Sequence, residues 1–222
     1  MSAAVIVALG FTSNSNPSGN TSMPEPGTPD EAIAEVLAGN LRYMKRMNES
    51  QEIVIDRDAL AAGQAPFAAV IRCADSRVAP EICFDQQLGR LFVCAVAGNI
   101  PTPEIIASLE YGVAVLGTKV IVIMGHSSCG AVEAAIKHRD DTSVLPGSLP
   151  RLIDQIVSPC AMKVDPDSKD ALDIAIRCNA NLGVDELIRR SPVIADAVKD
   201  GSLKIIAGVQ DLKSGKFTVT RK

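Results

Sequence analysis

Four apolar runs alternate with amphipathic segments along the chain. The runs cover residues 66–74, 91–97, 120–124 and 203–209. They are apolar throughout rather than alternating with polar residues, which is typical of strands that a parallel sheet buries on both faces. Because helix-like segments lie between the runs, the pattern predicts βαβ units and a mainly parallel sheet.

Helical spacing of apolar residues and helix-start signals mark the intervening segments. The first helix begins after Thr28 as N-cap and has Pro29 at its first position. The predicted helices cover residues 29–44, 56–62, 102–116, 128–138, 149–157, 168–190 and 193–199. After the fourth strand, a turn at 213–216 leads into a short strand at 217–220. The fold class is therefore α/β: a mainly parallel central sheet of about four strands plus a short antiparallel edge strand, flanked by helices, with an N-terminal helical arm.

The chain divides at the start of the first helix. Residues 1–28 combine the apolar stretch 3–11 with a segment rich in Asn, Ser, Pro and Gly. This composition predicts a flexible N-terminal arm or the remnant of a trimmed export signal, and residues 29–222 form a single domain. We expect a cytoplasmic protein, or a periplasmic or exported one if residues 1–28 are that remnant. The apolar stripe of the helix at 29–44 packs either on its own domain or on a partner subunit.

Composition and motifs argue against several classes of function. The net charge of −4, the absence of Trp and the lack of a long basic run argue against nucleic acid as the main partner. No apolar stretch is long enough to span a bilayer. No phosphate-binding glycine loop follows a predicted strand. The six cysteines are spread through the chain, and we interpret them as reduced metal ligands or core residues rather than a disulfide framework.

Polar side chains gather where two of the predicted strands end. Cys73 and Asp75 follow the first strand, and His126 and Cys129 follow the third. The carboxyl ends of neighbouring parallel strands meet at one edge of a sheet, where binding sites are built. Two thiolates, an imidazole and a carboxylate suit zinc. A closed site would use all four residues, whereas an open site would use Cys73, His126 and Cys129 and leave the fourth position to water.

Arg77 bears on the choice between these two sites. A bidentate pair between its guanidinium and Asp75 would keep the carboxylate ionised and off the metal. Asp75 could then accept a hydrogen bond from the metal-bound hydroxide. An ordinary salt bridge or helix-cap contact remains open for Arg77, as do a purely structural zinc site and simple core packing of the cysteines.

These residues resemble the β-class carbonic anhydrase family. The motifs are Cys73-Ala74-Asp75-Ser76-Arg77-Val78 and Gly125-His126-Ser127-Ser128-Cys129-Gly130-Ala131-Val132. The similarity runs from about Pro29 to the last strand and includes the segments 97–99 and 108–111. One departure is that Ala95 and Val96 stand where family members often carry Arg-Asn.

The resemblance implies a Zn2+ held by Cys73, His126 and Cys129, with Asp75 and Arg77 as a catalytic dyad. Asp75 becomes the fourth ligand if the site is closed. The resemblance also implies that four residues bind substrate: Gln64, Phe92, Ala97 and Tyr111. Because regulated members tend to lack the Gln, Gln64 favours the open, unregulated form. Family members are dimers or multiples of dimers, which implies a homodimer or a dimer of dimers.

The implied activity is that of a zinc lyase: reversible hydration of carbon dioxide to bicarbonate and a proton. Zinc-bound hydroxide would attack CO2, and the Gln64 amide would donate to a developing bicarbonate oxygen. Two alternatives stay open at this point. One is a carbon disulfide or carbonyl sulfide hydrolase on the same scaffold, and the other is a non-catalytic zinc-binding protein.

Overall fold

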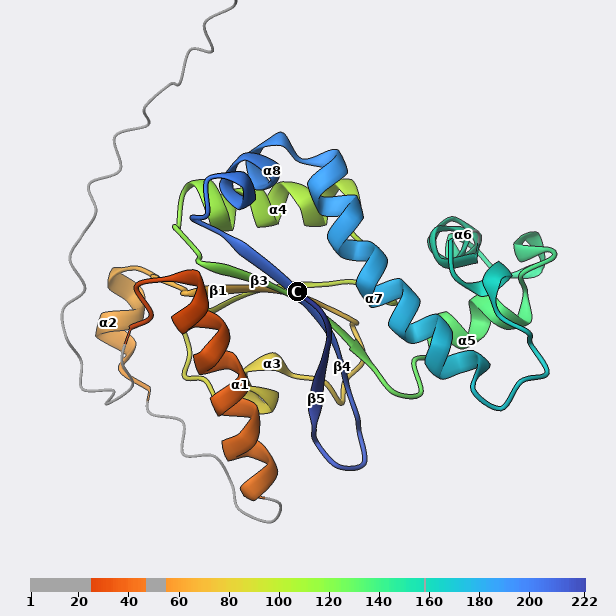
Figure 1. Ribbon diagram of the computed structural model, residues 1–222, viewed down its shortest axis with the longest axis horizontal. Coiled ribbons are helices and arrows are strands. Elements are labelled where there is room, and N and C mark those ends of the chain that lie inside the picture. Colours follow the sequence, from red (N-terminus) through yellow and green to blue (C-terminus); the bar gives the residue numbers. More distant parts are fainter. Residues whose placement is uncertain (1–24, 47–54, 158) are drawn as a thin grey trace, which may run out of the picture.

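A single mixed sheet organises the protein. The computed structural model describes residues 25–46, 55–157 and 159–222. Within these residues the sheet has five strands in the order β2-β1-β3-β4-β5, shown in Figure 1. The strands are β1 (Ala68–Arg72), β2 (Leu91–Ala95), β3 (Val120–His126), β4 (Lys204–Gln210) and β5 (Phe217–Arg221). β2, β1, β3 and β4 pair in parallel and β5 is antiparallel to β4, which confirms the predicted fold class.

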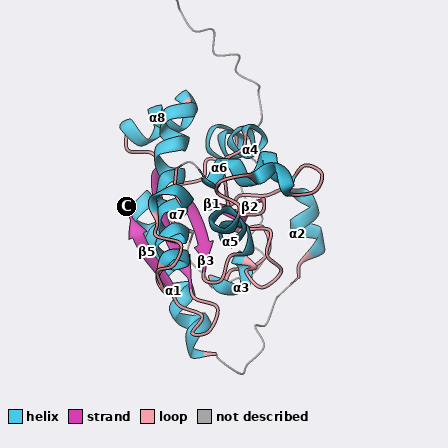
Figure 2. Ribbon diagram, turned by 90° about the vertical axis from the view of Figure 1, so that its right-hand side faces the viewer, coloured by secondary structure: helices cyan, strands magenta, loops and turns pink. Residues whose placement is uncertain are grey.

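Helices cover both faces of the sheet. Figures 1 and 2 show α4 and α8 on one side of it and α1 and α3 on the other. α5 and α6 lie beyond the end of the sheet where the parallel strands finish (Figure 1). The helices are α1 (Pro29–Lys45), α2 (Arg57–Ala62), α3 (Pro80–Cys83), α4 (Pro103–Ala114), α5 (Gly130–Lys137), α6 (Leu149–Val157), α7 (Ala171–Arg190) and α8 (Pro192–Lys199). The 3-10 turns η1 (Thr142–Val144) and η2 (Ala161–Lys163) connect some of them.

The continuous apolar runs are explained by two separate cores. Alternate strand residues such as Ile71 and Ile123 face α4, α7 and α8. Their neighbours, such as Val70 and Val122, lie in the other core, which α1 and α3 help to cover. Since successive strand residues point to opposite faces, a strand buried on both sides must be apolar at every position.

α1 packs on its own domain, one of the two options left open for it. Thr28 caps the helix, and Glu31 completes a capping box with the Thr28 backbone. Ala32, Ile33 and Val36 enter the core of the same chain. Leu41 stays more than half exposed. Residues 1–24, which include the apolar stretch 3–11, lie outside the described residues, so the expectation of a flexible arm or an export-signal remnant is not tested.

Several elements differ from the prediction, and three of the differences have a clear structural reason. β3 continues to His126, two residues further than predicted, because its partner β4 also continues to Gln210. α5 begins at Gly130 rather than at residue 128, because Ser128 has a left-handed backbone with φ +56°. The short α3 was missed altogether. Its single turn, which starts at Pro80, is too short to show a helical period.

The prediction that all six cysteines are reduced is wrong. Cys160 and Cys178 form a disulfide. Cys160 directly precedes η2, and Cys178 lies in α7. The two residues are separated by 18 positions and neither sits in a short, cysteine-rich scaffold, so spacing alone offered no sign of the bridge. The other four cysteines are free and buried. Among the described residues no helix is both long and apolar enough to cross a membrane.

Candidate metal centre

Two adjacent strands bring the candidate ligands together. β1 ends at Arg72, and Cys73 is the next residue. β3 ends at His126, and a tight turn through Ser128 places Cys129 as the N-cap residue of α5. Because β1 and β3 are neighbours in parallel, with Arg72 level with Met124, their carboxyl ends deliver these side chains to one point.

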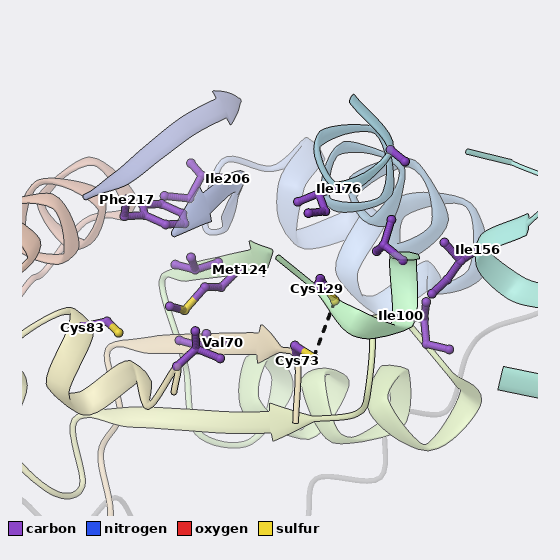
Figure 3. Close-up of a cluster of buried hydrophobic side chains, with 14 of the residues drawn as sticks. Val70, Cys73, Cys83, Ile100, Met124, Cys129, Ile156, Ile176, Ile206 and Phe217 are labelled. Carbon is purple, nitrogen blue, oxygen red and sulfur yellow. Dashed lines mark hydrogen bonds between the residues drawn. The ribbon is translucent and has the colours of Figure 1, made fainter. Parts of the chain in front are cut away.

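The three ligand atoms converge closely enough to share one ion. The sulfurs of Cys73 and Cys129 and a ring nitrogen of His126 all lie within 4.8 Å of one another. The two sulfurs are 4.0 Å apart and face each other in Figure 3. All three residues are buried. Bonds of about 2.0–2.3 Å from a central ion would span these separations.

His126 supplies the clearest evidence that a ligand is expected. Its Nδ1 lies 2.9 Å from the carbonyl oxygen of Ser127, which fixes the proton on Nδ1. Its Nε2 is buried and has no hydrogen-bond partner among the described residues. An imidazole with Nδ1–H bound to a carbonyl and a bare Nε2 is the arrangement of a metal-ligating histidine. The residues present therefore fit a metal ion.

The pKa values of the two thiols are shifted even without a metal. A hydrogen bond from Cys129, together with one from the Gly98 N–H, lowers the pKa of Cys73 to about 4 in spite of burial. The Cys73 thiolate and burial raise the pKa of Cys129 in return. One proton is thus shared between two sulfurs, and a cation that favours thiolates would displace it.

Asp75 lies beside the three ligands but is held by Arg77. The Arg77 side chain donates to both carboxylate oxygens, with Nε 2.9 Å from Oδ1 and Nη2 2.7 Å from Oδ2. The Arg77 backbone N–H also donates to Oδ1. These bonds hold the pKa of Asp75 well below its usual range. The nearer oxygen, Oδ2, is 3.9 Å from His126 Nε2, so the carboxylate faces the site from its edge.

Cys73 has a backbone contact that the sequence did not predict. The backbone N–H of Gly98 donates to its sulfur at 3.3 Å. Gly98 has φ +78°, and a Cβ there would come within 2.7 Å of the Ile156 side chain, so this position requires glycine. Asn179 of α7 donates to the Gly98 carbonyl. The segment 97–99 was noted as part of a motif, but a backbone donor and a partner 81 residues away leave no local signal.

The four expected substrate-binding residues are not brought together within one chain. Ala97 directly precedes Gly98 and so lies beside Cys73. Phe92 and Tyr111 contact each other, with ring centroids 6.1 Å apart, but Phe92 is level with Ala69 in β1. That register places Phe92 four residues before Cys73, about 13 Å away along the strand. Gln64 is exposed and precedes β1, at the same distant end of the sheet.

Comparison with known proteins identifies relatives over most of the chain. The family model described as carbonic anhydrase matches residues 68–217. "Carbonic anhydrase 2" of Mycobacterium tuberculosis is 38% identical over 189 residues, which cover 85% of this chain and 91% of that protein. "Carbonic anhydrase" of Pseudomonas aeruginosa is 34% identical and covers 83% of this chain and 86% of its own length.

Solved structures agree on the fold. The Coccomyxa β-carbonic anhydrase in complex with acetazolamide matches with a TM-score of 0.65 and 25% identity, over 87% of this chain and 83% of that one. One of two tetrameric β-carbonic anhydrases from Sordaria macrospora matches with a TM-score of 0.66 and 24% identity, over 86% of this chain and 95% of that one. At this identity the second likeness concerns the fold alone.

Proposed function

The chain belongs to the β-carbonic anhydrase family, and on that premise we propose that it catalyses the reversible hydration of CO2 to bicarbonate at a zinc ion held by Cys73, His126 and Cys129. The observation that carries the proposal is the convergence of three buried ligand atoms within 4.8 Å, one of them an imidazole nitrogen without a partner among the described residues. Two sulfurs and one nitrogen suit zinc rather than a hard cation such as magnesium.

A bound zinc would act as a Lewis acid that lowers the pKa of a coordinated water and so supplies a nucleophile near neutral pH. Cys73 and Cys129 would hold the ion as thiolates. His126 would use Nε2, with its Nδ1 proton kept on the Ser127 carbonyl. Because three side chains converge among the described residues, this site leaves a coordination position for the nucleophile.

Asp75 and Arg77 would control that fourth position. The bidentate pair keeps the carboxylate ionised and turned toward Arg77, so Asp75 does not close the site. An ionised Oδ2 at the edge of the site can accept the proton of the attacking oxygen in a hydrogen bond and orient its lone pair toward CO2. Arg77, more than half exposed, adds positive charge where bicarbonate forms.

We further propose that Gln64, Phe92 and Tyr111 complete the site of a partner subunit. They lie at the opposite end of the sheet from Cys73 of the same chain, and Tyr111 is 47% exposed beside the half-buried Phe92. An exposed aromatic pair of this kind is typical of a surface that another protein covers. A homodimer, or a dimer of dimers, would bring these residues of one chain to the metal of the other.

Mixing two inactive variants tests this sharing. Cys73→Ser removes a metal ligand, and Gln64→Ala removes the amide donor. If the sites are shared, mixed dimers contain one site with neither defect, and an equal mixture recovers about a quarter of wild-type activity after subunit exchange. If each chain serves its own site, no mixed dimer has an intact site and the mixture shows only the mean of the activities of the two variants.

The disulfide bears on the compartment. The cytosol keeps most thiols reduced, whereas the periplasm and extracellular space allow disulfides to persist. The Cys160–Cys178 bridge therefore favours the exported alternative over the cytoplasmic one. Thiol counting on protein isolated from fractionated cells checks this assignment.

Stopped-flow CO2 hydration tests the activity itself, with zinc-loaded protein from about pH 7 to about pH 9. Rates at every pH that rise smoothly as the water ionises support the proposal with an open site. A rate that appears only above about pH 8 means that Asp75 closes the site at neutral pH. No rate with one zinc per chain would reject the enzymatic proposal.

A further inference from the structure

The Cys160–Cys178 disulfide has no part in the proposed reaction, yet it joins two elements that lie against the metal centre. Cys160 is fully buried, and its backbone N–H donates to the Ile156 carbonyl of α6. Cys178 is partly buried on α7. The bridge therefore fixes the end of α6 to the first half of α7 by a covalent bond.

Both of these helices converge on Gly98. From α6, the Ile156 side chain reaches within 2.7 Å of the position that a Gly98 Cβ would occupy. From α7, Asn179 donates its Nδ2–H to the Gly98 carbonyl at 2.7 Å. Asn179 is the residue after Cys178 and is only 5% exposed. Figure 3 shows Ile156 on the same side of the sheet end as Ile100, which follows Gly98 by two residues.

Gly98 in turn contacts the metal ligand directly. Its N–H donates to Cys73 Sγ at 3.3 Å. A backbone donor aimed at a thiolate stabilises the charge and fixes the direction of the sulfur, and such outer contacts typically change metal affinity about 10- to 100-fold. Holding the Gly98 carbonyl restricts the backbone that carries this donor, and a glycine has the most freedom to lose.

We propose that the disulfide is a redox-sensitive clamp on the metal centre, which acts from Cys178 through Asn179 and Gly98 on Cys73. The inference rests on the metal site of the proposed function. Breaking the bridge removes the covalent link between the end of α6 and α7, which loosens α7 against α6 and weakens the Gly98 donor at Cys73.

The co-reactant is a dithiol reductant. It delivers two electrons and two protons to the S–S bond, leaves Cys160 and Cys178 as thiols, and is itself oxidised to a cyclic disulfide. The reaction consumes no metal and leaves Cys73 and Cys129 chemically unchanged. Re-oxidation by a disulfide of the surrounding redox buffer restores the clamp.

The test compares zinc release from the oxidised protein and from protein reduced with dithiothreitol, after anaerobic removal of the reductant. Zinc transfer to an excess of a chromogenic chelator gives the rate. We expect release from the reduced protein to be about 10-fold faster. A Cys160→Ala/Cys178→Ala protein should release zinc at the fast rate with or without prior reduction.

Two variants of α7 separate the clamp from a general loss of stability. Asn179→Ala keeps the disulfide but removes the contact with Gly98, so it should release zinc quickly in both redox states. Asn181→Ala is the matched control. Asn181 lies on the same helix, and its side-chain oxygen accepts a hydrogen bond from the Thr220 hydroxyl of β5. The Asn181→Ala protein should keep the wild-type rate of zinc release and the wild-type response to reduction.

Hydrogen exchange provides a reading that does not depend on metal. In the metal-free protein, the amides of residues 96–100 should exchange faster after reduction or in Asn179→Ala than in the oxidised wild type. If the wild type takes up no zinc, the proposed function fails, and this exchange still decides whether the clamp exists. Equal exchange in both redox states, equal zinc release in both, or six free thiols in protein isolated from an oxidising compartment would each overturn the clamp.

Discussion

The four free cysteines form two pairs that differ in their polar contacts, although all four are buried. Hydrogen bonds lower the pKa of Cys73 to about 4 where it faces Cys129. The Cys73 thiolate raises the pKa of Cys129. Burial raises the pKa of Cys83 to about 12 and that of Cys94 to about 11. The difference shows that burial by itself makes a cysteine a small apolar residue, while polar partners at a strand end make it a ligand.

Position in the sheet explains the contrast. Cys94 is inside β2, and its side chain packs with the apolar residues under α4. Cys83 ends α3 and packs under α1. Cys73 and Cys129 lie past the last residues of β1 and β3, where backbone N–H groups are no longer used by the sheet and can reach a sulfur. The following changes test whether this contrast holds.

The largest expected effect is loss of metal from Cys73→Ser. An alcohol is a far weaker zinc ligand than a thiolate, so zinc affinity should fall by at least about 100-fold, and the protein should purify with little zinc. Metal analysis of the purified protein gives the ratio of zinc to chain. Cys94→Ser, a change of the same kind at a core cysteine, should retain one zinc per chain. Equal retention in both proteins would remove the distinction between the pairs.

Loss of the dyad should reduce rate without reducing metal content. Asp75→Asn keeps the size of the side chain but replaces the carboxylate with a neutral amide. Arg77→Ala leaves Asp75 without its partner. We expect CO2 hydration to fall about 100-fold in either protein, while zinc content stays at the wild-type value. Stopped-flow kinetics and metal analysis on the same samples check both statements. Full activity in Asp75→Asn would show that the carboxylate has no part in the reaction.

The pH dependence of the dyad has a definite sign. Arg77 holds the pKa of Asp75 well below its usual range. The carboxylate therefore remains ionised at every pH above the pKa of a normal aspartate. A loss of rate between about pH 9 and about pH 6 therefore does not come from protonation of Asp75. In Arg77→Ala the pKa of Asp75 should rise, and a new acidic limb should appear in the pH–rate profile.

The metal-free protein should carry one thiolate at neutral pH. The lowered pKa means that Cys73 is deprotonated from about pH 4 upward, whereas Cys83 and Cys94 stay protonated until well above neutral pH. Ultraviolet absorption by thiolate therefore measures Cys73 alone. Between about pH 5 and about pH 8 the wild type should exceed Cys73→Ser by one thiolate. Equal absorption in the two proteins would place the charge elsewhere.

Sequence alone was sufficient for the fold class and for the convergence of Cys73, His126 and Cys129. Continuous apolar runs separated by helical periods specify a parallel sheet, and residues directly after neighbouring strands must meet at its carboxyl edge. His126 and Cys129 are three residues apart, so a single turn between them is enough to bring their side chains close together. The turn itself was misjudged, because Ser128 adopts a left-handed backbone that nothing in its residue type demands.

Long-range contacts account for what the sequence could not predict. Asn179 lies 81 residues from its partner Gly98, and the disulfide joins residues in different helices. Phe92 and Tyr111 pair with each other, yet only the strand register shows that they lie far from Cys73 of the same chain. Each of these three contacts depends on how helices and strands pack against one another in space. The local periodicity of the sequence carries no information on that packing.

The smallest effect expected from the cysteine comparison is on stability at Cys94. The Cys94→Ser hydroxyl would sit among apolar side chains such as Ile106 and Leu109 without a nearby polar partner. Burying it should lower the free energy of unfolding by about 1–2 kcal/mol, while zinc content and CO2 hydration stay at wild-type values. Urea unfolding of the zinc-loaded proteins measures the difference. A stability loss accompanied by zinc loss would mean that the core and the metal centre are coupled through β2, and the two pairs of cysteines would then no longer be independent.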